Sequence, residues 1–136
     1  MKIHITRNLL VDDLNKRFQG VYPYLKIHFF RSGQKKTERS NRVIKGVCLH
    51  DIAPWMKEGI ITIKGTMKVR ELEDLFITFF LLKVQVMRRS GNIWLETTAT
   101  DDWTLAHQNE HGEEITQMSN PAELDENDIE LQRNDD

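Results

Sequence analysis

Two histidines and a glutamate near the end of the chain have the spacing of a catalytic zinc site. His107, Glu110 and His111 fit the H-x-x-E-H pattern, in which histidines about one helical turn apart bind zinc and the glutamate polarises water. Peptidases with this pattern take a third ligand from further along the chain, whereas only 25 acidic-rich residues follow His111. We therefore predict two solvated histidines on a short helix, with no metal and no other cofactor.

Two further clusters could perform acid, base or nucleophilic chemistry. Cys48 and His50 would share one face of an extended chain, as a thiolate and its base require, but the apolar neighbours of Cys48 favour a small core residue instead. Asp101 and Asp102 precede Trp103 and could bind a cation, although a turn in which a carboxylate caps the next helix explains them as well. No catalytic constellation follows, so we do not expect an enzyme.

A basic segment followed much later by an acidic tail suggests a different chemistry. Residues 31–45 carry six cations and one anion, and such a loop suits contact with nucleic-acid phosphates. The six basic residues are Arg31, Lys35, Lys36, Arg39, Arg42 and Lys45. Residues 113–136 hold one basic and nine acidic side chains and no aromatic residue, so we predict a disordered tail that competes for the loop.

The composition sets the class of protein. The chain has 136 residues, 39% of them hydrophobic, with 19 basic and 21 acidic side chains and one cysteine. A chain of this size can bury a core without disulfides, and one cysteine fits a reducing compartment. The first residues alternate as a strand does and lack the apolar run of a signal peptide. We expect a cytoplasmic protein with no membrane segment.

The apolar pattern predicts two similar β-α-β units. In the first, Ile3 and Ile5 mark a strand, Val11, Leu14 and Phe18 mark a helix face, and the segment from Leu25 to Arg31 alternates as a strand. The same pattern returns 58 residues later, with a helix over 68–80 and a strand over 83–88 after a one-residue shift. This predicts a pseudo-repeat of residues 3–33 and 61–91, or else two units with a convergent pattern.

These units imply an α+β fold, a two-layer sandwich of the ferredoxin-like kind with helices on one side of a single sheet. The turn at 89–92 predicts an added hairpin strand over 93–100, and Thr104 to Gly112 reads as a short helix with a hydroxyl cap, or an Asp101 or Asp102 cap, and a glycine end. Residues 43–49 could form a further strand before a short helix near 51–56. We predict one domain over 1–112 and a tail over 113–136.

The open sheet face then determines the predicted function. Trp94, Ile60 and Phe30 would form an apolar patch suited to a protein interface. We predict a small, non-catalytic protein-interaction or self-associating module, whose partner is a second copy or another protein. The alternative is nucleic-acid binding through residues 31–45.

Overall fold

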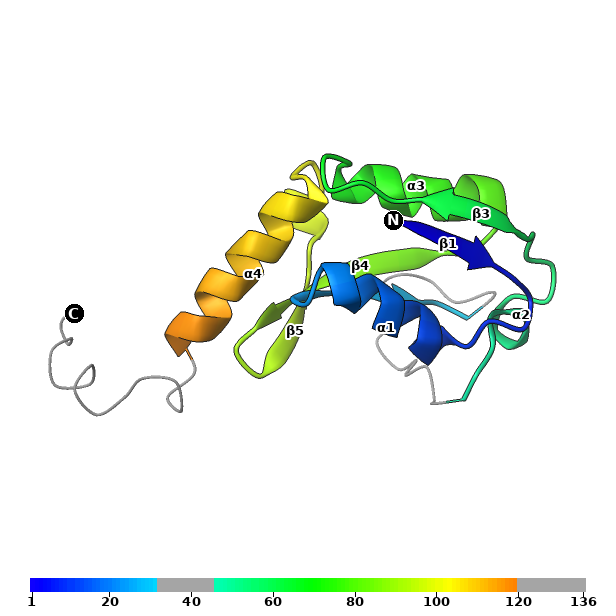
Figure 1. Cartoon of the computed structure of the whole chain (residues 1–136), viewed down its shortest axis with the longest axis horizontal. Helices are drawn as coiled ribbons and strands as arrows, with labels where there is room; N and C mark the ends of the chain where they lie inside the picture. Colours follow the sequence, from blue (N-terminus) through cyan, green and yellow to red (C-terminus); the bar gives the residue numbers. More distant parts are fainter. Residues whose placement is uncertain (32–45, 120–136) are drawn as a thin grey trace, which may run out of the picture.

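The computed structural model describes residues 1–31 and 46–119. Within these ranges the helical and extended segments alternate as the apolar pattern predicts (Figure 1). The elements are β1 (Lys2–Ile5), α1 (Val11–Val21), β2 (Leu25–Phe29), α2 (Leu49–Ile52), β3 (Gly59–Thr62), α3 (Val69–Phe80), β4 (Val84–Ser90), β5 (Ile93–Glu96), a 3-10 turn (Thr98–Thr100) and α4 (Leu105–Ser119).

The described strands form two antiparallel sheets, which confirms the α+β class but differs from the single sheet expected. One sheet pairs β1 with β3, and the other has the order β2-β4-β5. β2 and β3 do not pair as a hairpin, because the chain between them includes α2 and leads β3 to β1 instead. The expected strand over 43–49 is absent from its described part, where Cys48 forms an isolated bridge to Leu10 and α2 begins at Leu49.

Residues related by the 58-residue offset face one another at one place in the sheets, where Ile3 pairs with Ile61. In the other sheet Ile27 pairs with Val86, 59 residues later, although the pattern aligns Ile27 with Val84. The side-chain amide of Asn15 on α1 bonds both backbone groups of Ile27, at 2.8 and 2.9 Å. At the matching place in α3, Glu73 Oε2 accepts a 2.9 Å hydrogen bond from the backbone N–H of Val86. Each long helix therefore pins the backbone of its own strand by a polar side chain.

The helix starts are joined by matching backbone hydrogen bonds. At α1, Val11 N–H donates to Val47 O and Leu49 N–H donates to Leu9 O, both at 3.0 Å. At α3, Val69 N–H donates to Trp103 O at 3.0 Å, and Leu105 N–H donates to Met67 O at 2.8 Å. These bonds satisfy amides that a helix cannot pair internally, and they tie α1 to α2 and α3 to α4.

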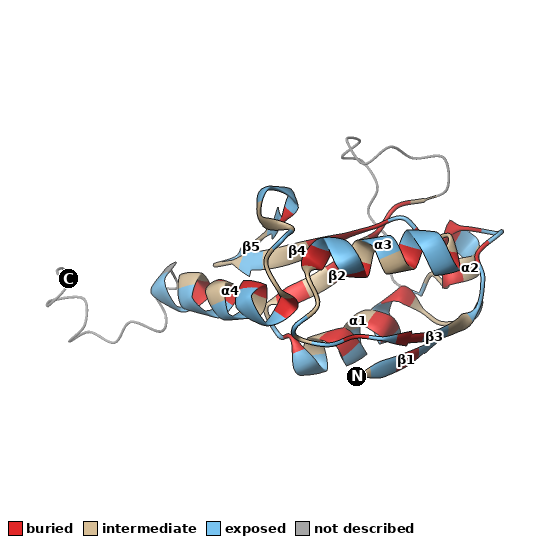
Figure 2. Cartoon of the chain, turned by 90° about the horizontal axis from the view of Figure 1, so that it is seen from above, coloured by how far each residue is buried: buried red, intermediate tan, exposed pale blue. Residues whose placement is uncertain are grey.

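The core lies between the helices and the inner faces of both sheets (Figure 2). The predicted helix faces are buried, with Val11, Leu14 and Phe18 on α1 and the matching three residues of α3, which also buries Phe80. The inner strand residues are Ile3, Ile5, Leu25, Ile27, Ile61, Val84 and Val86, all at most 2% exposed. The amphipathic pattern therefore places α1 and α3 as expected, because only one face of each can fill the core.

The β4–β5 hairpin is confirmed, with Gly91 in the two-residue turn at a φ of 65°. A positive φ at this position costs glycine little, as in a type II′ turn. The strand predicted over 93–100 is too long, because β5 ends at Glu96 and a 3-10 turn occupies Thr98–Thr100. The predicted helix end at Gly112 is wrong, because α4 continues to Ser119 beside the hairpin (Figure 1). Gly112 packs against Tyr24 and Arg88, and Thr116 Oγ1 accepts a 3.3 Å bond from Gly91 N–H. The proposed boundary at 112 thus falls inside a helix, and the tail from 120 lies outside the described residues.

Candidate functional site: a groove beside an open strand edge

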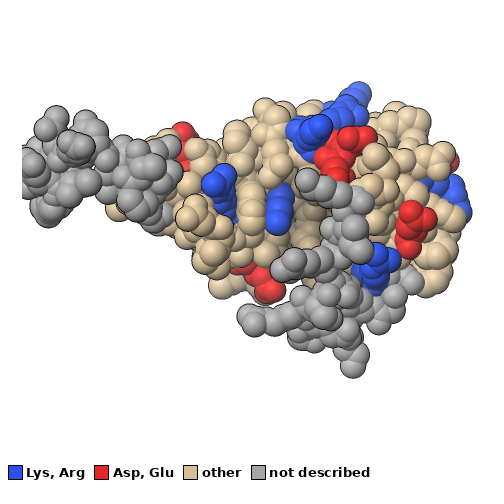
Figure 3. Space-filling model, turned by 90° about the horizontal axis from the view of Figure 1, so that it is seen from below, with Lys and Arg blue, Asp and Glu red and all other residues tan. Residues whose placement is uncertain are grey.

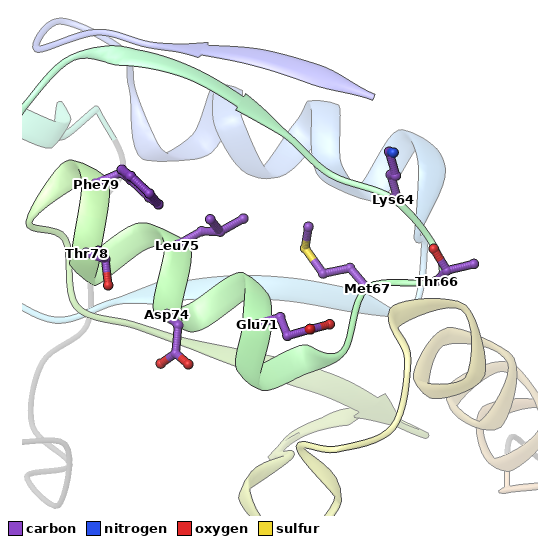
Figure 4. A pocket seen from close by; sticks show the side chains of 8 residues that line it. All are labelled: Lys64, Thr66, Met67, Glu71, Asp74, Leu75, Thr78 and Phe79. Atoms are coloured by element: carbon purple, nitrogen blue, oxygen red, sulfur yellow. The ribbon is translucent and has the colours of Figure 1, made fainter.

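A groove on the surface runs between α3 and the segment that follows β3 (Figure 4). The groove is open to solvent and has a volume of about 480 Å³. We call it the β3–α3 groove. Its lining residues are Lys64, Thr66, Met67, Glu71, Asp74, Leu75, Thr78 and Phe79. Phe79 is 61% exposed although it belongs to a helix whose other phenylalanines are buried. Covering this aromatic side chain with a ligand would be favourable, because it would remove apolar surface from water.

The edge of β3 that does not pair with β1 carries backbone groups to which no residue of 1–31 or 46–119 bonds. Met1 and Ile63 exchange two hydrogen bonds of 2.7 and 2.8 Å, so the alternation of an antiparallel ladder turns the backbone of Ile61 toward β1 and that of Ile60 and Thr62 outward. Among the described residues, nothing bonds these outward N–H and C=O groups. The edge of β3 therefore presents a row of donors and acceptors that no described residue satisfies.

The corresponding edge of β1 is closed. Arg17 on α1 donates a 2.9 Å hydrogen bond from Nη2 to the carbonyl oxygen of Lys2, on the outer edge of β1. Leu75 stands at the matching place on α3, 58 residues later, and it has no polar atom to offer the edge of β3. Exposed strand edges are commonly blocked by charged side chains, and here one edge has such a block and its counterpart does not.

The charged side chains on the helix wall of the groove are both acidic. Glu71 and Asp74 come from α3, and Lys64 lies at the opposite side, on the segment after β3 (Figure 4). Glu71 Oε1 already accepts a 2.8 Å hydrogen bond from the N–H of Lys68, so its charge helps to cap α3. Asp74 is exposed and no described residue bonds its carboxylate, which leaves that charge accessible to a ligand.

The three predicted interface residues do not share one surface. Ile60 is 64% exposed on β3, whereas Trp94 belongs to the other sheet. Trp94 is half-buried, with Lys26 Nζ 4.7 Å from the centroid of its ring. Phe30 is only 6% exposed and its ring meets His28 edge-on at 4.8 Å. The expectation of a common patch is therefore wrong, since Phe30 is buried and Ile60 lies apart from Trp94.

The neighbours of Trp94 form a small titratable cluster. Burial lowers the pKa of His28, the adjacent Lys26 ammonium lowers it further, and the carboxylate of Glu96 acts in the opposite sense. Burial also lowers the pKa of Lys26, whose ammonium lies over the Trp94 ring. The cluster holds His28 toward its neutral form, so it contributes a pH dependence to stability.

The residues of the H-x-x-E-H pattern lie on α4, as expected. The ring of His107 stacks on Trp103 at 4.3 Å, and His111 meets the same indole edge-on at 5.4 Å. His111 Nδ1 lies 4.0 Å from Glu114, while Glu110 is exposed. In residues 1–31 and 46–119, no group of three His, Cys, Asp or Glu side chains could hold a metal ion. Their contacts join the histidines to Trp103.

Helix capping accounts for the other polar clusters. Cys48 occupies the N-cap position of α2 and is half-exposed, so it is not a core residue. Its thiol and its backbone N–H donate hydrogen bonds of 3.2 and 3.4 Å to Asp51 Oδ2. His50 lies within α2, not on an extended chain with Cys48. At α4, Thr104 Oγ1 accepts a 3.1 Å bond from His107 N–H, which confirms the hydroxyl cap. Asp101 instead accepts a bond from Arg70 N–H through its backbone oxygen.

The predicted phosphate-binding residues fall almost wholly outside the described ranges. Only Arg31 is described, half-buried just after β2, whereas Lys35, Lys36, Arg39, Arg42 and Lys45 lie within 32–45. On the face shown in Figure 3, the basic and acidic side chains of the described residues are interspersed and separated by uncharged atoms. The described side chains that are visible on that face therefore form no broad basic surface of the kind that tracks a nucleic-acid backbone.

No protein-family model, curated protein or solved structure matches the chain. None of the described helices is long and apolar enough to cross a membrane.

The groove itself was missed by the sequence analysis, although α3 contains a signal for it. Leu75, Ile77 and Phe79 lie off the buried stripe of that helix, and apolar residues outside the core stripe indicate a second surface to cover.

Proposed function

We propose that the chain is a non-catalytic protein-interaction module whose binding surface is the β3–α3 groove. The exposure of Phe79 beside half-buried Met67 and Leu75 carries this proposal. Covering apolar side chains is the main favourable term in most protein associations, and an exposed aromatic residue in a groove is the usual anchor. The proposal keeps Ile60 as an interface residue and replaces Trp94 and Phe30 with residues of α3.

A non-catalytic role is supported by the contacts of the groups that could do chemistry. The Cys48 thiol is bonded to Asp51, and His107 stacks on Trp103. A nucleophile needs a base within hydrogen-bond reach, and these contacts supply a helix cap and a surface stack instead.

Nucleic-acid binding through residues 31–45 stays a prediction from sequence, as does the cytoplasmic location. The two proposed activities differ in their response to salt. Apolar binding at the groove should weaken little as the salt concentration rises, whereas phosphate contacts weaken steeply because displaced counterions compete.

A peptide-display selection on the immobilised full chain tests the proposed function. Peptides enriched over an unrelated bait are then titrated against the wild type, Phe79→Ser and Val21→Ser. Val21 occupies the place on α1 that matches Phe79 and is 51% exposed, so its replacement is a matched control. We expect Phe79→Ser to weaken binding at least about tenfold and Val21→Ser to leave it unchanged.

The same variants identify self-association. If light scattering finds a dimer that Phe79→Ser dissociates and Val21→Ser does not, the groove is an interface between copies and the proposed function stands. Enriched peptides that bind all three proteins equally would refute a binding role for the groove, as would the absence of both enriched peptides and a dimer.

A further inference from the structure

We infer that the β3–α3 groove takes a single extended segment of a partner protein, which pairs with β3 as an added strand and presents apolar and basic side chains to α3. This inference rests on the proposed function and specifies the occupant. Its first support is the backbone of Ile60 and Thr62, whose outward N–H and C=O groups have no partner among the described residues. Only another extended backbone offers donors and acceptors at the matching spacing.

The difference between the two halves of the chain supports the same conclusion. Arg17 reaches the outer carbonyl of Lys2, and a strand added to β1 would have to displace that guanidinium. The apolar side chain of Leu75 lines the groove at the matching place beside β3 and competes for no backbone group. A fold with two similar edges therefore blocks one of them and leaves the other bordered by an apolar wall.

The shape of the site favours one chain over a folded sheet edge. The segment that follows β3 contributes Lys64, Thr66 and Met67 to the groove, and α3 contributes the rest of the lining (Figure 4). A volume of about 480 Å³ suits a short peptide segment. A second copy would bring its own α3 along with its β3, and the groove would then have to admit a helix as well as a strand.

The charges select the side chains of that segment. Glu71 and Asp74 stand on the helix wall, and Asp74 makes no ion pair with a described residue. Phe79, Leu75 and Met67 supply apolar surface along the same groove. Successive side chains of a strand point to opposite faces. A segment with alternating apolar residues and at least one Lys or Arg near Asp74 would therefore match both the apolar surface and the acidic charges of the groove.

Synthetic peptides with removable backbone donors test the pairing. The probe is the capped hexapeptide Lys-Leu-Lys-Leu-Lys-Leu, compared with the Glu-Leu hexapeptide at constant ionic strength. Two N-methylated forms of the probe lack N–H groups on odd or on even residues. A strand added to β3 turns only one of these sets toward Ile60 and Thr62. We expect one N-methylated form to lose at least about tenfold in affinity and the other less than about twofold.

Three variants of the full chain complete the test. Leu75→Arg places a guanidinium where Arg17 stands in the other half, and it should weaken the probe at least about tenfold. Arg17→Leu should leave binding at the groove unchanged. Asp74→Asn should remove most of the preference for the Lys-Leu over the Glu-Leu hexapeptide.

Equal losses for the two N-methylated forms would overturn strand pairing. A probe that binds Leu75→Arg and the wild type alike would refute the location. If instead no peptide binds and the chain forms a dimer sensitive to Phe79→Ser, the single-strand inference fails while the proposed interaction function stands.

Discussion

Two helical glycines should respond to alanine with opposite signs, because only one of them is a packing contact. Gly20 lies in α1, is exposed and has no atom within 4 Å of the place where a Cβ would lie. Gly112 lies in α4, where an added Cβ would come within 2.9 Å of Tyr24 Cβ and 3.0 Å of Arg88 Cγ. The first distance is closer than real Cβ contacts allow, and Tyr24 Cβ is fixed by its own backbone.

The expected magnitudes follow from these contacts. Replacing glycine by alanine within a helix gains about 1 kcal/mol from helix propensity and the smaller entropy of the unfolded chain. Gly20→Ala should therefore raise the free energy of unfolding by about 0.5–1 kcal/mol. Gly112→Ala has the same gain, but overpacking at a tight contact costs about 1–3 kcal/mol. We expect no stabilisation and up to about 2 kcal/mol of net loss as α4 is pushed from β4.

Urea unfolding of the full chain, followed by tryptophan fluorescence, measures both changes. At this chain length, 1 kcal/mol corresponds to about 3–5 °C in Tm, so thermal unfolding gives a second reading. A Gly112→Ala variant as stabilised as Gly20→Ala would refute the close packing of α4 on Tyr24 and Arg88. That result would instead favour the shorter helix, ending at Gly112, that the sequence predicts.

Three smaller predictions concern individual contacts. Asn15→Ala should lower the free energy of unfolding by about 1–2 kcal/mol in urea titrations, because both backbone groups of Ile27 lose their protein partner; an unchanged midpoint would mean that water replaces the amide without loss. The pKa of His28 in the folded chain is below its ordinary 6.5, so the stability linked to this group is fully present above that pH and is lost as the pH falls toward the folded value. His28→Gln should therefore flatten the dependence of Tm on pH between about 7 and 5. A variant that keeps the wild-type slope would assign the pH dependence to other groups. Thr104→Ala should cost about 1 kcal/mol by removing the cap of α4, whereas no loss would mean that the backbone bridge to Lys68 suffices.

The local elements could be predicted from sequence because their signals are local. The stripe of Val69, Leu72 and Phe76 fixes the buried face of α3, and the glycine turn fixes the β4–β5 hairpin. The α+β class follows from these elements. Their assembly into two sheets does not, since the pairing of β1 with β3 depends on where the chain between β2 and β3 leads it.

The candidate site was harder to predict, because it depends on which side chains are exposed and which backbone groups are unpaired once the chain has folded. Ile60 was chosen as an exposed apolar residue, and the structure exposes it, but no sequence pattern shows that its backbone is unpaired. Phe79 and Phe80 are adjacent and equally apolar in the sequence, although only Phe80 is buried. Glycine commonly ends a helix, but Gly112 lies within α4, where it allows a close approach to Tyr24. The sequence alone does not show where Tyr24 lies.

Amide hydrogen exchange of the chain, with and without a saturating Lys-Leu hexapeptide, tests the central claim most directly. The amides of Ile60 and Thr62 point away from β1 and should exchange fast in the free chain and slowly in the complex. The amide of Ile61, already turned toward β1, should change little. Unaltered exchange at Ile60 and Thr62 under saturating peptide would contradict strand addition at β3.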